Sequence, residues 1–258
     1  MYNTKILTDN GVNLEKSLEL FGDMDTYNET LVDFLNDVER KLHDIKKYKE
    51  LSDMANYAIL VHSLKSDAKY FGFERLAELA YNHELRSKAN DMYYVADNYK
   101  ELMEEANRIV KLVKSYLGVA TEKDIKKETT HSDNTEKNKI LVVDDSNIIS
   151  NFITKIFDDT YDVISLKDGK EAIDFLASNT STIRGMLLDL NMPNVNGYKV
   201  LDYLKENNLF NIVPVVIITG VDTKDEINKT FSYPIVDVLS KPFNERDVKN
   251  VIERVIRN

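Results

Sequence analysis

Two patterns of hydrophobic positions divide the chain. In residues 13–118, apolar residues recur at spacings of three and four, as on one face of a helix. Such sets are Leu31, Phe34, Leu35, Val38 and Leu42, then Leu76, Leu79 and Ala80, then Leu102, Ala106, Ile109, Leu112, Val113 and Leu117. Gly72 and Gly118 stand where helices are expected to stop. The pattern predicts four main helices with one short helix before them. Because the connections are short, an up-down all-α bundle is expected.

The second pattern occupies residues 138–258. Five apolar runs rich in β-branched residues alternate with helical stretches; the runs are KILVV, YDVISL, GMLLDL, PVVIIT and IVDVL. Runs that are apolar on both faces are typical of strands in a parallel sheet covered on both sides. Five strand–helix units predict a doubly wound α/β domain with a five-stranded parallel sheet, the flavodoxin-like arrangement.

Residues 119–137 follow neither pattern. Their sequence, VATEKDIKKETTHSDNTEK, is rich in Lys, Glu, Thr and Asp. Such a composition is typical of flexible linkers, because it offers little apolar surface to bury. We therefore expect a multidomain chain with a helical bundle at 1–118, a flexible linker at 119–137 and an α/β domain at 138–258.

The composition limits the classes of function. The net charge is −10 and neither half is basic, so nonspecific binding to nucleic acid or to an anionic membrane is disfavoured. The absence of cysteine excludes disulfides and thiolate metal sites. No apolar run approaches the ~20 residues of a membrane span, and the N-terminus lacks a signal-peptide core, so a cytoplasmic location is expected. The eight glycines form no GxG or GxxxxGK loop, which disfavours a stand-alone kinase.

Polar residues follow the predicted strands of the second half at their C-terminal ends. They are Asp144 and Asp145 after the first strand, Asp189 at the third, Thr219 at the fourth and Lys241 after the fifth. Ligands of open parallel sheets bind beyond these ends, so the five side chains are expected to converge. Three carboxylates repel one another, and Mg²⁺, which prefers oxygen ligands, would relieve the repulsion. Asp189 could then attack a phosphoryl group, with Lys241 and Thr219 stabilising the phosphoryl oxygens.

The motifs ILVVDDS, LLDLNMPNVNG, VVIITG and LSKPF resemble those of the receiver domain of two-component response regulators, over essentially all of 138–258. The resemblance implies that Asp189 is the phosphoacceptor. It also implies that Asp144 and Asp145 hold Mg²⁺ together with Asp189 and the backbone carbonyl of Asn191.

The same resemblance implies that Thr219 and Lys241 bind the phosphoryl group, and that the Lys241–Pro242 bond is cis. One position departs from the family pattern. Many receivers carry Tyr or Phe three residues before the lysine, and this ring turns inward when the threonine moves. Here Val238 occupies that position, so the coupling of Thr219 to an aromatic residue is left open.

One histidine of the first half stands out. A helical wheel places Met54, Val61, Leu64, Ala68 and Phe71 in one apolar stripe. His62 lies about 130° from the centre of that stripe, so an outward-facing, exposed imidazole is expected. Lys65 and Lys69 follow on the same side and would attract a phosphoryl group. The other histidines are assigned no special role: His43 at a Lys-rich helix end, His83 on a polar helix face and His131 in the linker.

The stretch LVHSLKSDAKYFGFERLAELAYNHE resembles the phosphoacceptor region of histidine-containing phosphotransfer (HPt) domains, and LELFGDMDTYNETLVDFLNDVERKL resembles their opening. The similarity spans roughly residues 13–118. It implies that His62 is a phosphoacceptor and that Lys65 gives it electrostatic support. Ser66 stands where the family usually has glycine, and serine is still small enough to leave access to the ring.

Together the two resemblances predict a two-component phosphorelay protein. His62 and Asp189 would exchange phosphoryl groups with each other, through intramolecular docking, or with partner proteins such as a sensor histidine kinase, another receiver or another HPt protein. One alternative is an adaptor controlled by phosphorylation, in which His62 is not used. A haloacid dehalogenase-type phosphatase is disfavoured, because Asn191 replaces the second aspartate of its Asp-x-Asp motif. Whether the chain is a piece of a longer protein is left open.

Overall fold

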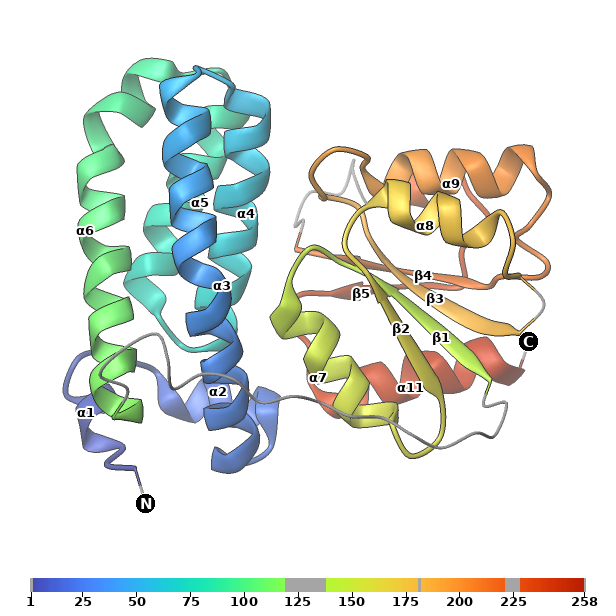
Figure 1. The fold of residues 1–258 in the computed structure, drawn as a ribbon, viewed down its shortest axis with the longest axis horizontal. Helices are drawn as coiled ribbons and strands as arrows, with labels where there is room; N and C mark the ends of the chain where they lie inside the picture. Colours follow the sequence, from blue (N-terminus) through green and yellow to red (C-terminus); the bar gives the residue numbers. More distant parts are fainter. Residues whose placement is uncertain (1, 119–137, 181, 221–227, 258) are drawn as a thin grey trace. The chain divides into compact units, whose positions relative to one another are not determined.

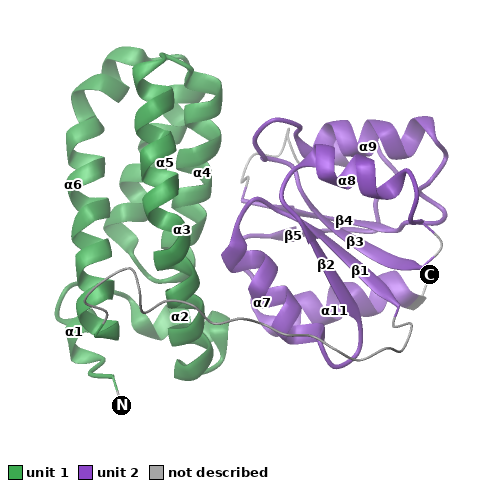
Figure 2. Ribbon diagram, in the orientation of Figure 1, with its two compact units in different colours: residues 1–133 green, residues 134–258 purple. Residues whose placement is uncertain are grey.

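The computed structural model of the chain describes residues 2–118, 138–180, 182–220 and 228–257. The chain divides into two compact units, Met1–Asp133 and Asn134–Asn258, which Figure 2 colours separately. The linker expected at 119–137, with His131, lies outside the described residues. Among the helices that the structure describes, none has the length and apolar character needed to cross a membrane.

The regular secondary structure described in the first unit is all helix. Its elements are α1 (Lys5–Thr8), α2 (Leu14–Phe21), α3 (Met24–Glu50), α4 (Met54–Tyr70), α5 (Glu74–Lys88) and α6 (Met92–Leu117). The four main helices are confirmed, and two short helices rather than one precede them. Each long helix packs against two others in the order α3, α4, α5, α6, with α6 returning to α3 (Figure 1).

Local signals fix where these helices begin and end. The helices α3, α4 and α6 each start after an aspartate, Asp23, Asp53 or Asp91, whose carboxylate accepts a hydrogen bond from a backbone N–H of the first turn. Helix α6 ends at Gly118, which adopts the left-handed conformation that only glycine takes at little cost. The stops expected from the sequence near Gly72 and Gly118 are therefore confirmed.

The predicted stripes face the interior of the helical unit. Every member of the stripe on α4 is at most 6 % exposed, and so is every member of the set on α3. Phe71, at the end of the α4 stripe, lies 5.4–5.7 Å from the rings of Phe21, Tyr27, Phe34 and Phe73. This aromatic cluster ties the ends of α2, α3 and α4 together.

The second unit is a parallel α/β sheet. Its strands are β1 (Lys139–Val143), β2 (Asp162–Leu166), β3 (Ile183–Asp189), β4 (Val215–Thr219) and β5 (Asp237–Ser240), in the spatial order β2-β1-β3-β4-β5. Its described helices are α7 (Asn147–Phe157), α8 (Gly169–Leu176), α9 (Gly197–Glu206) and α11 (Glu245–Arg257). Figure 1 shows α8 and α9 on one face and α7 and α11 on the other. The five predicted strands are confirmed, whereas the helix expected after β4 falls largely outside the described residues.

The strand register positions the chemistry of this unit. All pairs are parallel, with Val143 of β1 opposite Leu188 of β3, and Asp189 of β3 opposite Ile218 of β4. The carboxyl ends of β1, β3 and β4 therefore meet at one edge. Every residue of β4, and all but the first of β1, is buried, as expected for central strands covered on both faces.

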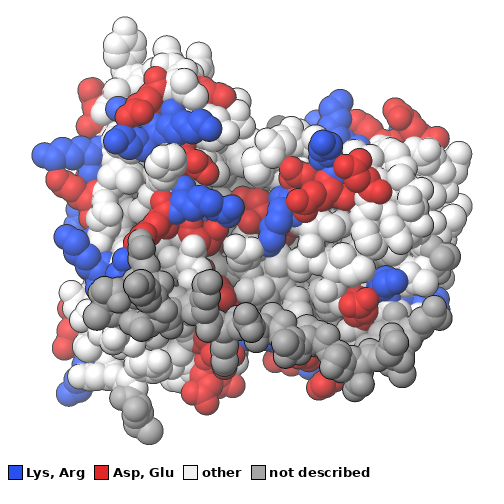
Figure 3. All heavy atoms as spheres, in the orientation of Figure 1, with Lys and Arg blue, Asp and Glu red and all other residues white. Residues whose placement is uncertain are grey.

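Charge is mixed on the surface. Figure 3 shows Lys and Arg side chains interspersed with Asp and Glu over the described residues of the face that it draws. Mixed charge of this kind produces no large field of one sign across that face.

Candidate functional site

Three aspartates meet at the sheet edge. Asp144 and Asp145 follow β1 and Asp189 ends β3, and one carboxylate oxygen of each lies within 4.8 Å of the others. Asp144 and Asp189 are at most 1 % exposed, whereas Asp145 is half-buried. Three converging carboxylates form an all-oxygen donor set, which is the set that Mg²⁺ prefers. The residues present therefore fit the magnesium ion expected from the sequence.

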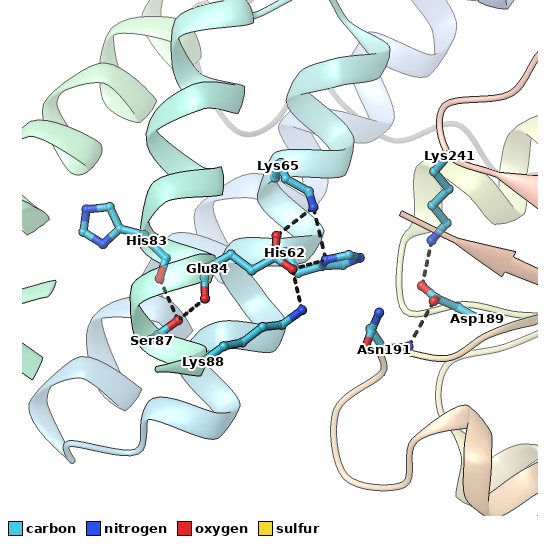
Figure 4. Close-up of polar contacts among 9 residues, drawn as sticks. All are labelled: His62, Lys65, His83, Glu84, Ser87, Lys88, Asp189, Asn191 and Lys241. Atoms are coloured by element: carbon cyan, nitrogen blue, oxygen red, sulfur yellow. Dashed lines mark hydrogen bonds and ion pairs between the residues drawn. The ribbon is translucent and has the colours of Figure 1, made fainter. Parts of the chain in front are cut away.

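Lys241 joins the same cluster from the end of β5. Its Nζ lies 2.7 Å from Oδ2 of Asp144. The same Nζ lies 2.7 Å from Oδ2 of Asp189 (Figure 4). Burial lowers the pKa of Lys241, but the two carboxylates outweigh burial and hold that pKa well above its usual range. Burial raises the pKa of Asp144, and the attraction of Lys241 opposes this rise. The Lys241 ammonium is thus held charged between two carboxylates, and its peptide bond to Pro242 is cis, as expected.

Thr219 and Asn191 border the cluster. Thr219 ends β4 beside Asp189 of β3, is 1 % exposed, and accepts a hydrogen bond at its carbonyl from the Lys241 backbone N–H. The backbone N–H of Asn191 donates to Oδ1 of Asp189 over 3.0 Å, which orients that carboxylate. Val238, at the position of the aromatic switch residue, is half-buried in β5 and packs against the core.

His62 lies in a second cluster, within the helical unit. Its Nδ1 lies 2.7 Å from Oε1 of Glu84 on α5. Lys65 reaches Oε2 of Glu84 at 2.7 Å and Lys88 reaches Oε1 at 2.8 Å (Figure 4). Burial raises the pKa of Glu84, but the hydrogen bond and charge of His62, with the charge of Lys65, outweigh it and lower that pKa strongly. Burial also lowers the pKa of Lys65, against the pull of Glu84. Glu84 is therefore an ionised carboxylate.

The predicted exposure of His62 is wrong, because the residue is 2 % exposed. On its Nδ1 side the reason is the packing of α5 along α4, which brings the carboxylate of Glu84 against the ring. A helical wheel describes one helix and takes no account of such a neighbour. Nε2 of His62 is buried and has no hydrogen-bond partner within the described residues. Lys65 is 3 % exposed and Lys69 is half-buried.

The acidic cluster and the sheet lie in the part of the chain that known proteins share. A family model for the response regulator receiver domain matches residues 140–253. The probable methanogenesis regulatory protein FilR2 of Methanothrix harundinacea is 32 % identical over 123 residues, which cover 45 % of this chain and 79 % of FilR2. The CheY homolog of Campylobacter jejuni is 30 % identical over 122 residues, 46 % of this chain and 92 % of that protein. The chain belongs to the response regulator receiver family.

Receiver domains are signalling modules of two-component systems, work with histidine kinases and other signalling proteins, and typically bind Mg²⁺ in the active site. The transcriptional regulatory protein CiaR of Streptococcus pneumoniae is 33 % identical over 46 % of this chain, which spans about half (51 %) of CiaR. Among solved structures, the receiver domain of the Francisella response regulator 1452 has a TM-score of 0.43 and 27 % identity, covering 47 % of this chain and 98 % of that chain.

In this receiver domain, a loop clamp that sequence reasoning missed supports Asp189. Asp168 accepts hydrogen bonds from two N–H groups of α8 and from Nδ2 of Asn194, which follows β3. The N–H of Gly169 donates to the carbonyl of Val195 over 2.9 Å. A Cβ at Gly197 would lie 2.2 Å from the Asp189 carbonyl, so only glycine fits there. The loop between β3 and α9 is thus held at both ends.

Sequence reasoning also missed Glu84 and misplaced His83. The sequence predicts His83 on a polar helix face, but it is fully buried, with Nδ1 2.7 Å from the hydroxyl of Tyr57. His43 is exposed, and its Nδ1 lies 3.3 Å from Oδ1 of Asp44. One signal for Glu84 was present in the sequence. Glu84 continues the line of Leu76 and Ala80 at intervals of four, so a charged residue extends an apolar stripe.

Proposed function

We propose that this chain is a phosphorelay protein in which Asp189 and His62 each carry a phosphoryl group. The observation that carries the proposal is the presence, in one chain, of two clusters suited to the two chemistries. One holds a carboxylate between a lysine and two further aspartates, and the other holds an imidazole against an ionised carboxylate. The domains would be an HPt-like bundle at 1–118, a linker at 119–137 and the receiver at 138–258.

At the receiver, an oxygen of Asp189 attacks phosphorus. A P–O bond forms, and the bond between phosphorus and the donor breaks with its electron pair on the leaving group. The Asp144, Asp145 and Asp189 carboxylates and the Asn191 carbonyl would hold Mg²⁺, which supplies neutralisation of the phosphoryl oxygens when bound. Lys241, already at 2.7 Å from Asp189, and Thr219 donate hydrogen bonds to those oxygens. The Asn191 N–H keeps the attacking carboxylate oriented.

At the helical unit, Glu84 selects the nucleophilic nitrogen of His62. An ionised carboxylate can only accept, so Nδ1 of His62 carries a proton, and in the neutral ring that attacks phosphorus Nε2 keeps a free lone pair. When Nε2 attacks an aspartyl phosphate, an N–P bond forms, the P–O bond breaks and the aspartate carboxylate is regenerated. The ring then gains positive charge, which the Glu84 carboxylate stabilises. Lys65 and Lys88 keep Glu84 ionised throughout.

The experiment that tests this proposal follows phosphate between the two acceptors. The full chain is phosphorylated with acetyl phosphate and Mg²⁺, and acid-labile, base-stable phosphohistidine is separated from base-labile acyl phosphate. We expect both species in the wild type, and acyl phosphate alone in His62→Gln. His43→Gln is the matched control and should behave as the wild type.

Mixing the His62→Gln and Asp189→Asn chains separates the two routes. If phosphohistidine forms in the mixture, the phosphoryl group is transferred between chains. If it forms in the wild type but not in the mixture, the transfer occurs within one chain. Label on Asp189 alone in every sample, with no transfer to His62 from any added phosphorylated receiver, would refute the role of His62.

That last outcome favours the second candidate function, an adaptor whose receiver controls a partner while His62 plays no part. The burial of His62 is the observation in favour of this candidate, because transfer needs Nε2 to be reached. The adaptor predicts that His62→Gln leaves signalling intact, whereas the phosphorelay predicts its loss.

A further inference from the structure

Ser66 lies one helical turn after His62 on α4. Residues four apart on a helix are surface neighbours, with about 5–6 Å between their Cβ atoms. At about 100° per residue, Ser66 flanks His62 on one side at about 40°, whereas Lys65 flanks it on the other at about 60°. Lys65 and Glu84 hold the Nδ1 edge of the ring, and Figure 4 shows Nε2 pointing away from Glu84. Ser66 therefore lies on the flank of His62 opposite Lys65.

The Ser66 hydroxyl, like that of Ser63, does not make the hydrogen bond that several other helical hydroxyls make. Four other helical hydroxyls donate to the carbonyl four residues earlier; the pairs are Ser17 to Asn13, Thr30 to Thr26, Ser87 to His83 and Thr154 to Ser150. Ser66 is 4 % exposed, yet its Oγ has no hydrogen-bond partner in the part of the chain that the structure describes. Buried hydroxyls without a partner are rare and call for an explanation. A ligand that is absent from the unphosphorylated state provides one.

We infer that the Ser66 hydroxyl donates a hydrogen bond to the phosphoryl group carried on Nε2 of His62. The inference rests on the proposed function and deepens it. Nε2 of His62 and Oγ of Ser66 are both buried, both lack a hydrogen-bond partner among the described residues, and belong to residues one turn apart. A phosphoryl group on Nε2 brings three strong acceptor oxygens to that turn. Ser66 forms no covalent bond and moves no proton; it positions the phosphoryl group and stabilises the phosphohistidine.

The role is specific to serine at this position. Glycine, the residue usual in the HPt family that this unit resembles, offers no donor, and alanine offers none either. Threonine keeps the hydroxyl. Ser63 supplies a matched control, because its Oγ is also buried and without a described partner, but it lies about 100° around the helix from His62.

The test measures the phosphohistidine itself. Full-length Ser66→Ala, Ser66→Gly, Ser66→Thr and Ser63→Ala chains are phosphorylated on His62 by phosphoramidate in the presence of EDTA, which removes the receiver's metal. We expect the phosphohistidine of the alanine and glycine variants to decay about 10-fold faster than that of the wild type. The Thr variant and Ser63→Ala should stay within about twofold of the wild type, because both retain the donor.

A second measurement reports on the hydrogen bond directly. A donor to the phosphoryl dianion favours its charged form, so the ³¹P titration midpoint of the phosphohistidine should rise by about 0.5–1 unit in Ser66→Ala. Equal lifetimes and equal midpoints in wild type and Ser66→Ala would overturn the inference while leaving the phosphorelay intact. If the wild type forms no phosphohistidine from phosphoramidate or from a phosphorylated receiver, the proposed role of His62 fails as well. Circular dichroism checks that each variant is folded.

Discussion

The two proposed phosphoacceptors sit in clusters of opposite charge balance. Around His62, one carboxylate, Glu84, meets two ammonium groups. Around Asp189, three carboxylates meet the ammonium group of Lys241. In the first cluster the ammonium groups neutralise the carboxylate without a metal. The second cluster keeps excess negative charge that only a cation can offset. We therefore expect the helical unit to bind a phosphoryl group with side chains alone, and the receiver to need Mg²⁺.

The clusters also differ in how the fold builds them. In the receiver, parallel strand ends bring Asp144, Asp189 and Thr219 to one edge, so backbone register alone sets their spacing. In the helical unit, His62 and Glu84 come from two helices and meet only because α4 and α5 pack together. Side-chain packing is more easily disturbed by one substitution than sheet register is. We therefore expect the receiver site to be most sensitive to substitution of its reacting groups. The His62 site should be most sensitive to substitution of Glu84, its hydrogen-bond partner.

The largest expected effect is the loss of Asp189. We expect Asp189→Asn to remove acyl phosphate formation completely, at least ~1000-fold, because the amide is not a nucleophile toward phosphorus. Labelling by acetyl phosphate and Mg²⁺, followed by intact-mass measurement, checks this. Asp174→Asn, on the exposed side of α8, should label as the wild type does. Acyl phosphate on Asp189→Asn would mean that another carboxylate is the acceptor.

Removal of divalent cations should separate the two clusters. With EDTA we expect labelling of Asp189 to fall by about 100-fold or more, because three carboxylates then repel the incoming phosphate. The decay of phosphohistidine on His62 should not change, since Glu84 and the lysines remain in place. Parallel assays of both phosphorylated forms, with and without EDTA, provide the measurement. Equal sensitivity of the two forms to EDTA would show that the His62 cluster also depends on a divalent cation.

The receiver could be predicted from the sequence almost completely. Its strands are apolar on both faces, and polar residues such as Asp189 and Lys241 follow them at one end, so one-dimensional pattern and parallel topology together bring the site residues to one sheet edge. The loop clamp of Asp168 and Asn194 was beyond this reasoning, because side-chain contacts between loops leave no periodic signal.

The helical unit could be predicted only in part. Periodicity predicts the buried apolar stripes and the positions of the four main helices, because each of these features depends on the sequence of one helix at a time. The burial of His62 and His83 was not predictable in this way, because it depends on which neighbouring helix faces each side chain. Glu84, 22 residues from His62 along the chain, contributes its charge from another helix.

The partner of His62 gives the next smaller effect. We expect Glu84→Gln to slow the phosphorylation of His62 by about 10- to 100-fold, because the amide neither fixes the tautomer nor stabilises the charged ring. The labelling of Asp189 should not change. Glu78→Gln, an exposed glutamate of the same helix, is the matched control. If Glu84→Gln and Glu78→Gln accept phosphate at equal rates, the contact between His62 and Glu84 has no part in the chemistry.

The smallest expected effect concerns the pH dependence of stability. Residues 138–258 contain no histidine, so histidine titration can affect only the rest of the chain. Burial lowers the pKa of His83 below its ordinary value of 6.5, against the opposing Asn98 carbonyl and Glu101 charge. The unfolded chain therefore binds the proton more readily. The stabilisation by neutral His83 is complete above pH ~6.5 and is lost as the pH falls through the lowered value.

We expect His83→Gln to reduce the loss of Tm between pH 7 and pH 5 by about 3–6 °C relative to the wild type, measured by far-ultraviolet circular dichroism on the full chain. Glutamine can still bond the Tyr57 hydroxyl, so the difference reports mainly on titration. His43→Gln, at an exposed position, should keep the wild-type slope. Equal slopes for His83→Gln and the wild type would show that the buried histidine does not make the helical unit acid-sensitive. Such a result would mean that the pH dependence of stability comes from carboxylates, which both units contain.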